Sequence, residues 1–379
     1  MVLLVTALLM SACHSSKDEE LPQPEEDCFL DIYVYAPNNP IITRADVGEV
    51  KVADESENRV KTLKIWVFRH SDVESAPAVG YLEADPTFLN QMGQQKYQLK
   101  LDKDFANKPK AVDVYAVANE ASANSSQNLG KSSTRTDLNA AKVSSDKFGV
   151  SELVSKVPDE GLPMSAILKD QPISGKFPTL HIGSETEMAT MQLTRVVSKL
   201  RFVLSREQSE GTDNIPVSIK SIKLDAGMIP ATEYLFLANN GYRYNVGAPY
   251  NTAAFEFLNS SLTDINSNDD PMQYAYQIGK DAQAYEELLA TGIGEGKLTQ
   301  VGPFYLRESD KRLSGTITYQ AQGSEERTVT FRMSAAGDFT RNHTWTVYAY
   351  YGGSRLEVVS VFVNKWIDNT LSDRRIHNW

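Results

Sequence analysis

Cys13 is the residue near the N-terminus whose setting predicts covalent chemistry. It follows an apolar run and the small residues Ser11 and Ala12, which is the layout of a bacterial lipoprotein export signal. The run is too short to span a bilayer, which needs about 20 apolar residues. We therefore expect residues 1–12 to be a cleaved signal peptide and Cys13 to carry a lipid. A chance apolar N-terminus is the alternative, because no lysine or arginine precedes the run.

No other group of residues has the spacing of a known catalytic or metal site. The stretch from Asp264 begins like a calcium loop, but Asp269 stands where that loop needs glycine and Ala275 where it needs glutamate. The five histidines have no zinc-type spacing and the two cysteines form no Cys-x-x-Cys pair, although histidines could still converge in space. We predict that the protein is not an enzyme and needs no metal and no cofactor.

Charge and composition restrict the partners. The formal net charge is −11 over 379 residues, and nucleic acid is not expected as a partner because phosphate neutralisation requires a basic face. Residues 14–27 are polar, acidic and proline-containing, which predicts a flexible tether after Cys13. No second apolar segment approaches membrane-spanning length, so we expect membrane attachment through the lipid alone.

Alternating apolar and polar residues predict that strands dominate the chain. In residues 29–36 the alternation places Leu30, Ile32, Val34 and Ala36 on one face. Residues 112–118 are almost wholly apolar, which predicts a buried central strand. Further strands are expected at residues 62–69 (with Leu63, Ile65 and Val67 on one side), 199–204, 217–224, 315–320, 327–332, 345–350 and 357–363, the last two as a hairpin around Gly352-Gly353. Helices are expected at residues 282–289, stopped near Gly292, and around Val150–Val154.

Strands at both ends of the chain predict a mainly β fold. We expect two tandem β-sandwich domains of the transthyretin-like or Greek-key type, with a few short helices. The predicted domains are residues 45–190 and 191–379. One large β domain is the alternative.

Several segments, taken in order, carry a resemblance to a known family. They are residues 31–48, 59–68, 112–121, 193–201, 339–345 and 361–366, with the tail that ends at Trp379. In this order they resemble the fimbrillins, the subunits of the Bacteroidales-type (type V) pili. The resemblance implies a lipoprotein precursor at the outer membrane that an arginine-specific or trypsin-like protease cuts after an arginine. The first strand then leaves, and a strand of a neighbouring subunit fills the groove.

The resemblance assigns roles to particular residues. Arg44 and Ala45 flank the implied cut, so residues 13–44 would be a lipidated propeptide with the removable strand at about residues 29–36. Without the resemblance, Arg44 reads as an ordinary surface arginine. The candidate donor segment is residues 367–379, with apolar anchors at Ile367, Leu371, Ile376 and Trp379. These anchors do not share one parity, so a bulge is needed, and a terminal strand packed on its own domain is the alternative.

The expected function is therefore that of a structural subunit of a cell-surface fimbrium (pilus), which supports adhesion. Its expected partners are other fimbrillin subunits, in a homopolymer or a mixed pilus, and the mature form is expected in extracellular fimbriae. Two alternatives stay open: an anchor or tip adhesin of the same pilus, and a monomeric glycan-binding surface lipoprotein. For the last, Tyr348, Tyr350 and Tyr351 are the candidate contacts.

Overall fold

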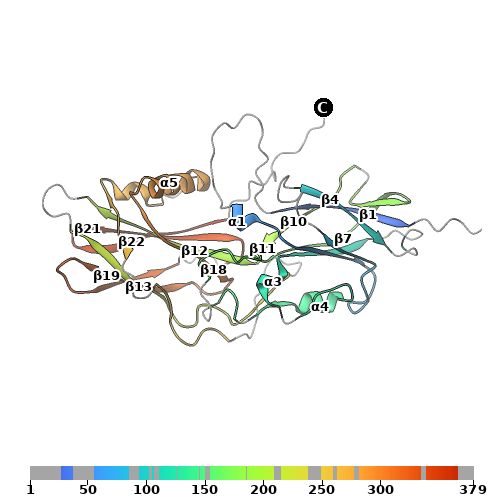
Figure 1. The fold of residues 1–379 in the computed structure, drawn as a ribbon, viewed down its shortest axis with the longest axis horizontal. Helices are drawn as coiled ribbons and strands as arrows, with labels where there is room; N and C mark the ends of the chain where they lie inside the picture. The colour runs from blue at the N-terminus through green and yellow to red at the C-terminus, as the bar shows by residue number, and fades with distance from the viewer. Residues whose placement is uncertain are drawn as a thin grey trace, which may run out of the picture.

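The computed structural model describes most of the chain between residues 27 and 365. The described residues are 27–36, 55–84, 94–101, 105, 111–125, 127–144, 146–149, 154–184, 186–208, 215–237, 249–258, 263–276, 281–333 and 339–365. Strands dominate them, so the predicted mainly β class is confirmed. Figure 1 shows one set of strands on the right, from the N-terminal part of the chain, and two sheets on the left.

The N-terminal half forms one sheet that folds back over itself. Its strands are β1 (Cys28–Tyr35), β2 (Leu63–Arg69), β3 (Gly80–Ala84), β4 (Gln94–Leu101), β5 (Val112–Ala118), β7 (Met164–Gln171), β8 (Ile173–Lys176), β9 (Thr179–Ile182), β10 (Thr190–Gln192) and β11 (Thr194–Arg195). Their order is β11-β7-β5-β2-β3-β4-β1-β9-β8, with β10 also beside β1.

The fold in this sheet lies between β3 and β4. Only Gly80 and Leu101 pair there among the described residues, and a Cβ on Gly80 would lie 2.7 Å from the Leu101 side chain. Apolar side chains of β2, β5 and β7 meet those of β1, β4, β9 and β10 in one core. The sheet is thus a sandwich closed around this core, as a sheet with one apolar face per layer requires.

The C-terminal half is a second sandwich made of two sheets. One contains β12 (Val197–Glu207), β17 (Ser267–Asn268), β18 (Thr299–Arg307), β21 (His343–Gly352) and β22 (Arg355–Lys365). The other contains β13 (Val217–Leu224), β15 (Phe255–Leu258), β16 (Thr263–Asp264), β19 (Ser314–Ala321) and β20 (Arg327–Arg332). Their facing side chains form a second apolar core, and the predicted hairpin at Gly352-Gly353 is confirmed.

Short helices cover edges and faces of the sandwiches. They are α1 (Glu55–Asn58), α3 (Glu120–Ala123), α4 (Arg135–Ala140), the 3-10 helix η2 (Pro271–Tyr274) and α5 (Ala282–Gly294). Tyr285 and Leu289 of α5 pack on Val203, Tyr348 and Phe362, so α5 covers the outer face of the β12-β21-β22 sheet (Figure 1).

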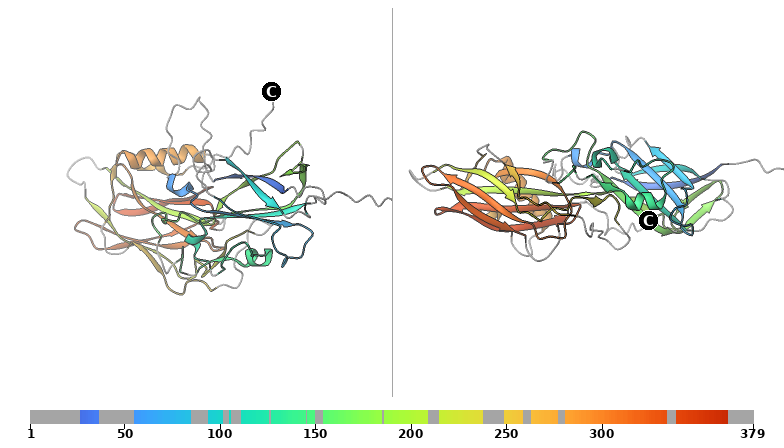
Figure 2. Two further views of the ribbon diagram at one scale, coloured as in Figure 1. Left: turned by 45° about the vertical axis from the view of Figure 1, so that its right-hand side comes forward. Right: turned by 90° about the horizontal axis from the view of Figure 1, so that it is seen from below.

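The two halves lie end to end and share a third core. The right-hand view of Figure 2 shows the elongated molecule from below. The shared core joins Trp66 and Phe68 of β2 to Val197, Phe236 and Tyr305. The strands β6 (Lys142–Val143) and β14 (Glu233–Tyr234) also pair across the junction. The first sheet runs on to Arg195, and the division into domains at residues 190 and 191 stays a prediction.

Three sequence expectations need correction or extension. The alternation places Leu63, Ile65 and Val67 on one side of β2, where they are buried, but Trp66 and Phe68 are buried on the other side too, because the shared core covers it. Helix α5 continues past Gly292 to Gly294. Of the helix expected around Val150–Val154, only Val154 is described, and it forms an isolated bridge to Tyr305.

Candidate assembly site around strand β1

Strand β1 is an internal strand, although it is the first described element of the chain. It pairs antiparallel with β4 along its whole length, from Cys28 opposite Leu101 to Tyr35 opposite Gln94. On its other edge it pairs parallel with β9 and then with β10. A strand with neighbours on both edges has few unpaired backbone groups, so its removal would leave two exposed sheet edges.

The inward face of β1 is fully apolar. Cys28, Leu30, Ile32 and Val34 are 0 % exposed and Ala36 is 4 % exposed. They contact Tyr97, Leu99 and Leu101 of β4, Leu180 and Ile182 of β9, and Met191 of β10 within the same core. The predicted inward face of residues 29–36 is therefore confirmed; the strand's removal in maturation stays a prediction.

The outward face of β1 carries a polar contact at its centre. The Asp31 carboxylate accepts from the Lys96 ammonium at 3.1 Å and from the Gln98 amide at 3.1 Å, both on β4. The Asp31 side chain is only 13 % exposed, whereas that of Lys96 is 49 % exposed. A second ion pair, Lys100 with Asp27 at 2.7 Å, lies at the beginning of the strand and is more open to solvent.

Cys28 is a structural residue of this site. Its thiol is free and buried, and burial raises the pKa of that thiol. A neutral thiol in an apolar core is a small apolar side chain rather than a nucleophile.

The remaining predicted site residues lie outside the described part of the chain. These are Cys13, Arg44, Ala45, Ile367, Leu371, Ile376 and Trp379. The tyrosines considered for glycan binding are described. Tyr348 is fully buried and donates to the carbonyl of Pro271, and Tyr350 and Tyr351 are half-buried against the two C-terminal cores. They do not form an exposed aromatic platform.

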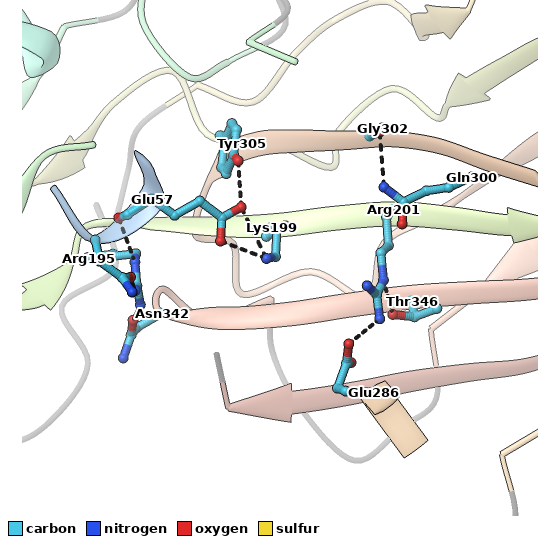
Figure 3. A network of polar contacts seen from close by, with 11 residues as sticks. Glu57, Arg195, Lys199, Arg201, Glu286, Gln300, Gly302, Tyr305, Asn342 and Thr346 are labelled. Carbon is cyan, nitrogen blue, oxygen red and sulfur yellow. Dashed lines mark hydrogen bonds and ion pairs between the residues drawn. The ribbon is translucent and has the colours of Figure 1, made fainter. Parts of the chain in front are cut away.

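A buried polar cluster fixes α1 at the junction of the two halves (Figure 3). The Glu57 carboxylate accepts from Lys199 at 2.9 and 3.1 Å and from the Tyr305 hydroxyl at 2.6 Å. Arg195 donates to the backbone carbonyl of Glu57 at 3.2 Å and to the Asn342 side chain at 2.9 Å. Burial alone would raise the pKa of Glu57, but the charge of Lys199 and the Tyr305 hydrogen bond outweigh it, and the pKa is lowered.

A second buried cluster lies where β14 crosses to the N-terminal half. Arg341 donates to the Glu308 carboxylate at 2.5 and 3.0 Å, and the Glu308 backbone N–H donates to Glu233 at 2.8 Å. All three side chains are buried. Burial, aided by the charge of Glu308 and opposed by that of Arg341, raises the pKa of Glu233 to about 8.

The junction residues cannot be recognised from the sequence alone. Residues 193–201 enter the sequence reasoning only as part of the resemblance and of an expected strand, yet Lys199 and Arg201 alternate with the core residues Leu200 and Phe202. That alternation indicates a polar face, but nothing near Glu57 shows that it is the partner. Glu57 and Lys199 are 142 positions apart in the sequence, so only the folded chain brings them together.

Within the described residues, no cluster of three or more histidine, cysteine, aspartate or glutamate side chains is placed to hold a metal ion. The same part of the chain has no helix that is both long and apolar enough to cross a membrane.

Comparisons with known proteins give similarities in structure only. No protein-family model and no curated protein matches the chain. A candidate cell adhesion protein of Parabacteroides distasonis is 14 % identical with a TM-score of 0.48, over 92 % of this chain and 99 % of that one. The tip fimbrial protein Mfa3 of Porphyromonas gingivalis, with a C-terminal truncation, is 13 % identical with a TM-score of 0.46, over 90 % and 100 %. A fimbrial protein of Bacteroides vulgatus is 10 % identical with a TM-score of 0.42, over 90 % and 99 %.

Proposed function

We propose that this protein is a structural subunit of a bacterial cell-surface fimbrium that supports adhesion. It is exported as a lipoprotein precursor, cut after Arg44, and assembled by exchange of strand β1 for a strand of a neighbouring subunit. The observation that carries the proposal is the position of β1. It is the first described strand, yet it lies inside a sheet and closes an apolar core.

Chain connectivity supports the exchange. Residues 37–54 connect β1 to α1, and Arg44 lies in that connection. A cut there separates β1 from every later described element without breaking any of them. Helix α1 follows the cut and so belongs to the mature chain, and the bonds of Glu57 to Lys199 and Tyr305 hold it on the C-terminal half.

The energetics of an emptied site also support the exchange. Burial of Leu30, Ile32 and Val34 contributes about 1.5–3 kcal/mol each, so roughly 5–9 kcal/mol of apolar burial is lost with the strand. The emptied site would have an apolar floor and two unpaired strand edges, on β4 and on β9 and β10. Such a surface recruits a replacement strand by β-augmentation.

The lipid and the C-terminal segment complete the proposal. Cys13 would hold the precursor at the outer membrane until an arginine-specific or trypsin-like protease releases residues 13–44. The mature chain would then enter extracellular fimbriae, and residues 367–379 with Ile367, Leu371, Ile376 and Trp379 would serve as a donor segment toward a neighbouring subunit.

N-terminal sequencing of the protein in fimbriae sheared from the bacterial surface tests this function. The expected first residue is Ala45, and Arg44→Ala should leave the protein in the membrane fraction with the Cys13 peptide still attached. A cut after Arg59 would instead give a chain that begins at Val60 and lacks α1. The first residue of the fimbrial protein therefore distinguishes a cut after Arg44 from a cut after Arg59. Recovery of only uncut, monomeric protein from wild-type cells contradicts the proposal. A polymerised but uncut, lipidated form at the base of the fimbria would assign the anchor role instead.

A further inference from the structure

Strand β4 carries two hydrogen-bond donors that stay behind when β1 leaves. Lys96, Gln98 and Lys100 share the outward face of β4, while Tyr97, Leu99 and Leu101 face the core. Lys96 and Gln98 both donate to Asp31, whose side chain is 13 % exposed. When β1 leaves, these two donors remain at the rim of the empty site without their acceptor.

Beyond Cys28, the floor of the same site accommodates four aliphatic side chains in alternation. Leu30, Ile32, Val34 and Ala36 fill it, and each is at most 4 % exposed. A replacement strand therefore needs apolar residues at four alternate positions. The site also favours an acceptor between the first and second of them, because Lys96 and Gln98 both donate to that position and Lys96 would repel a basic residue there.

The C-terminal segment of this chain lacks that pattern in every register. Between residues 363 and 379, each run of four alternate positions contains a charged residue, which is one of Lys365, Asp368, Asp373, Arg374 and Arg375. A regular strand from this segment would place that charge in the apolar floor. Residues 363–379 therefore fit the β1 site of another copy of this chain poorly, and a different acceptor suits them better.

We propose that the β1 site accepts a strand of a different subunit, with aliphatic residues at four alternate positions and an acidic residue that Lys96 and Gln98 bind. The assignment rests on the proposed function, because the site opens only if β1 leaves. It identifies Lys96 and Gln98 as residues that set the register and the partner, and it makes the fimbrium a mixed polymer at this subunit. A one-residue slip would turn the acid into the apolar floor, so the contact fixes register as well as identity.

The assignment is tested by peptide binding to the mature protein. This sample is prepared by cutting the whole chain after Arg44 and removing residues 1–44. The probe is a fluorescent peptide of residues 25–37, which carries the required pattern. Asp31→Lys in the peptide should weaken binding about tenfold or more, and Lys96→Asp in the protein should restore it. Asp27→Lys is the matched control, because its pair with Lys100 is exposed, and about threefold or less is expected there. A peptide of residues 363–379 should bind more weakly than the probe.

The outcomes separate the two proposals. A chain that is never cut at Arg44, or that keeps β1 permanently after the cut, refutes the proposed function itself. Equal binding of the Asp31→Lys peptide, or no rescue by Lys96→Asp, overturns the partner assignment alone. So does assembly of the purified, cut chain into fibres by itself, which would show that its own tail fills the site.

Discussion

Truncation of Ile32 should loosen β1 in the cut protein far more than truncation of its neighbour. Ile32 lies at the middle of β1, opposite Tyr97, and is 0 % exposed in the N-terminal core. Replacing a buried isoleucine with alanine costs about 2–5 kcal/mol, because the removed atoms leave a partly unfilled cavity. Each 1.4 kcal/mol changes a binding constant tenfold, so the cut segment should bind the rest of the chain more weakly by a factor of about 30 to several thousand.

The assay is the fraction of the N-terminal segment that stays with the cut chain on gel filtration, measured against protein concentration and time. Tyr33→Ala is the matched control, since Tyr33 is the next residue, faces outward and is half-buried. It should weaken retention much less than Ile32→Ala. If the two variants release the segment equally, the inward face of β1 is not what holds it, and the strand-exchange argument fails.

Two further predictions concern the buried clusters. Glu57→Ala should lower the free energy of unfolding by roughly 3–5 kcal/mol, since it removes the buried carboxylate that Lys199 binds. Glu295→Ala, which breaks an exposed pair with Lys297, should change the denaturation midpoint little. The folded state lowers the pKa of Glu57, so its carboxylate stabilises the fold above its ordinary pKa of 4.5. This stabilisation should be lost on acidification below 4.5, and urea titrations at several pH values measure the loss. The pH dependence that Glu233 causes has the opposite sign. With its pKa raised to about 8, the folded state holds a proton that the unfolded state has released, so the free energy of unfolding should fall from pH 4.5 to 8. Glu233→Gln should flatten that fall, and an unchanged slope would show that Glu233 is ionised in the fold.

The sequence predicts the strands whose environment is uniform along their length. Alternation in β1 and an almost wholly apolar run in β5 each correspond to one kind of surroundings, a single core face or burial on both sides. Strand β2 departs from its prediction because its second face is covered by residues from the other half, such as Tyr305. Periodicity carries no information about a surface that a distant segment will cover.

Asn119 shows a second limit of sequence reasoning. The sequence marks it only as the residue after an apolar strand. In the structure it has a φ of 55° and its side chain accepts from the Lys61 N–H and donates to the carbonyls of Arg59 and Leu162. Asparagine suits both demands, since it tolerates the left-handed region and offers donor and acceptor together. The need for it arises only when three separate segments meet.

The double-edged pairing of β1 has a mechanical consequence. The strands run largely along the long axis of the molecule (Figure 1), and the occupant of the β1 site bonds to β4 on one edge and to β9 and β10 on the other. Tension applied along that axis would stretch all of these bonds together, rather than peel them one after another. Parallel loading of many weak bonds resists force much better than sequential opening. A fibre joined in this way would hold under drag while still being assembled from separate, non-covalent pieces.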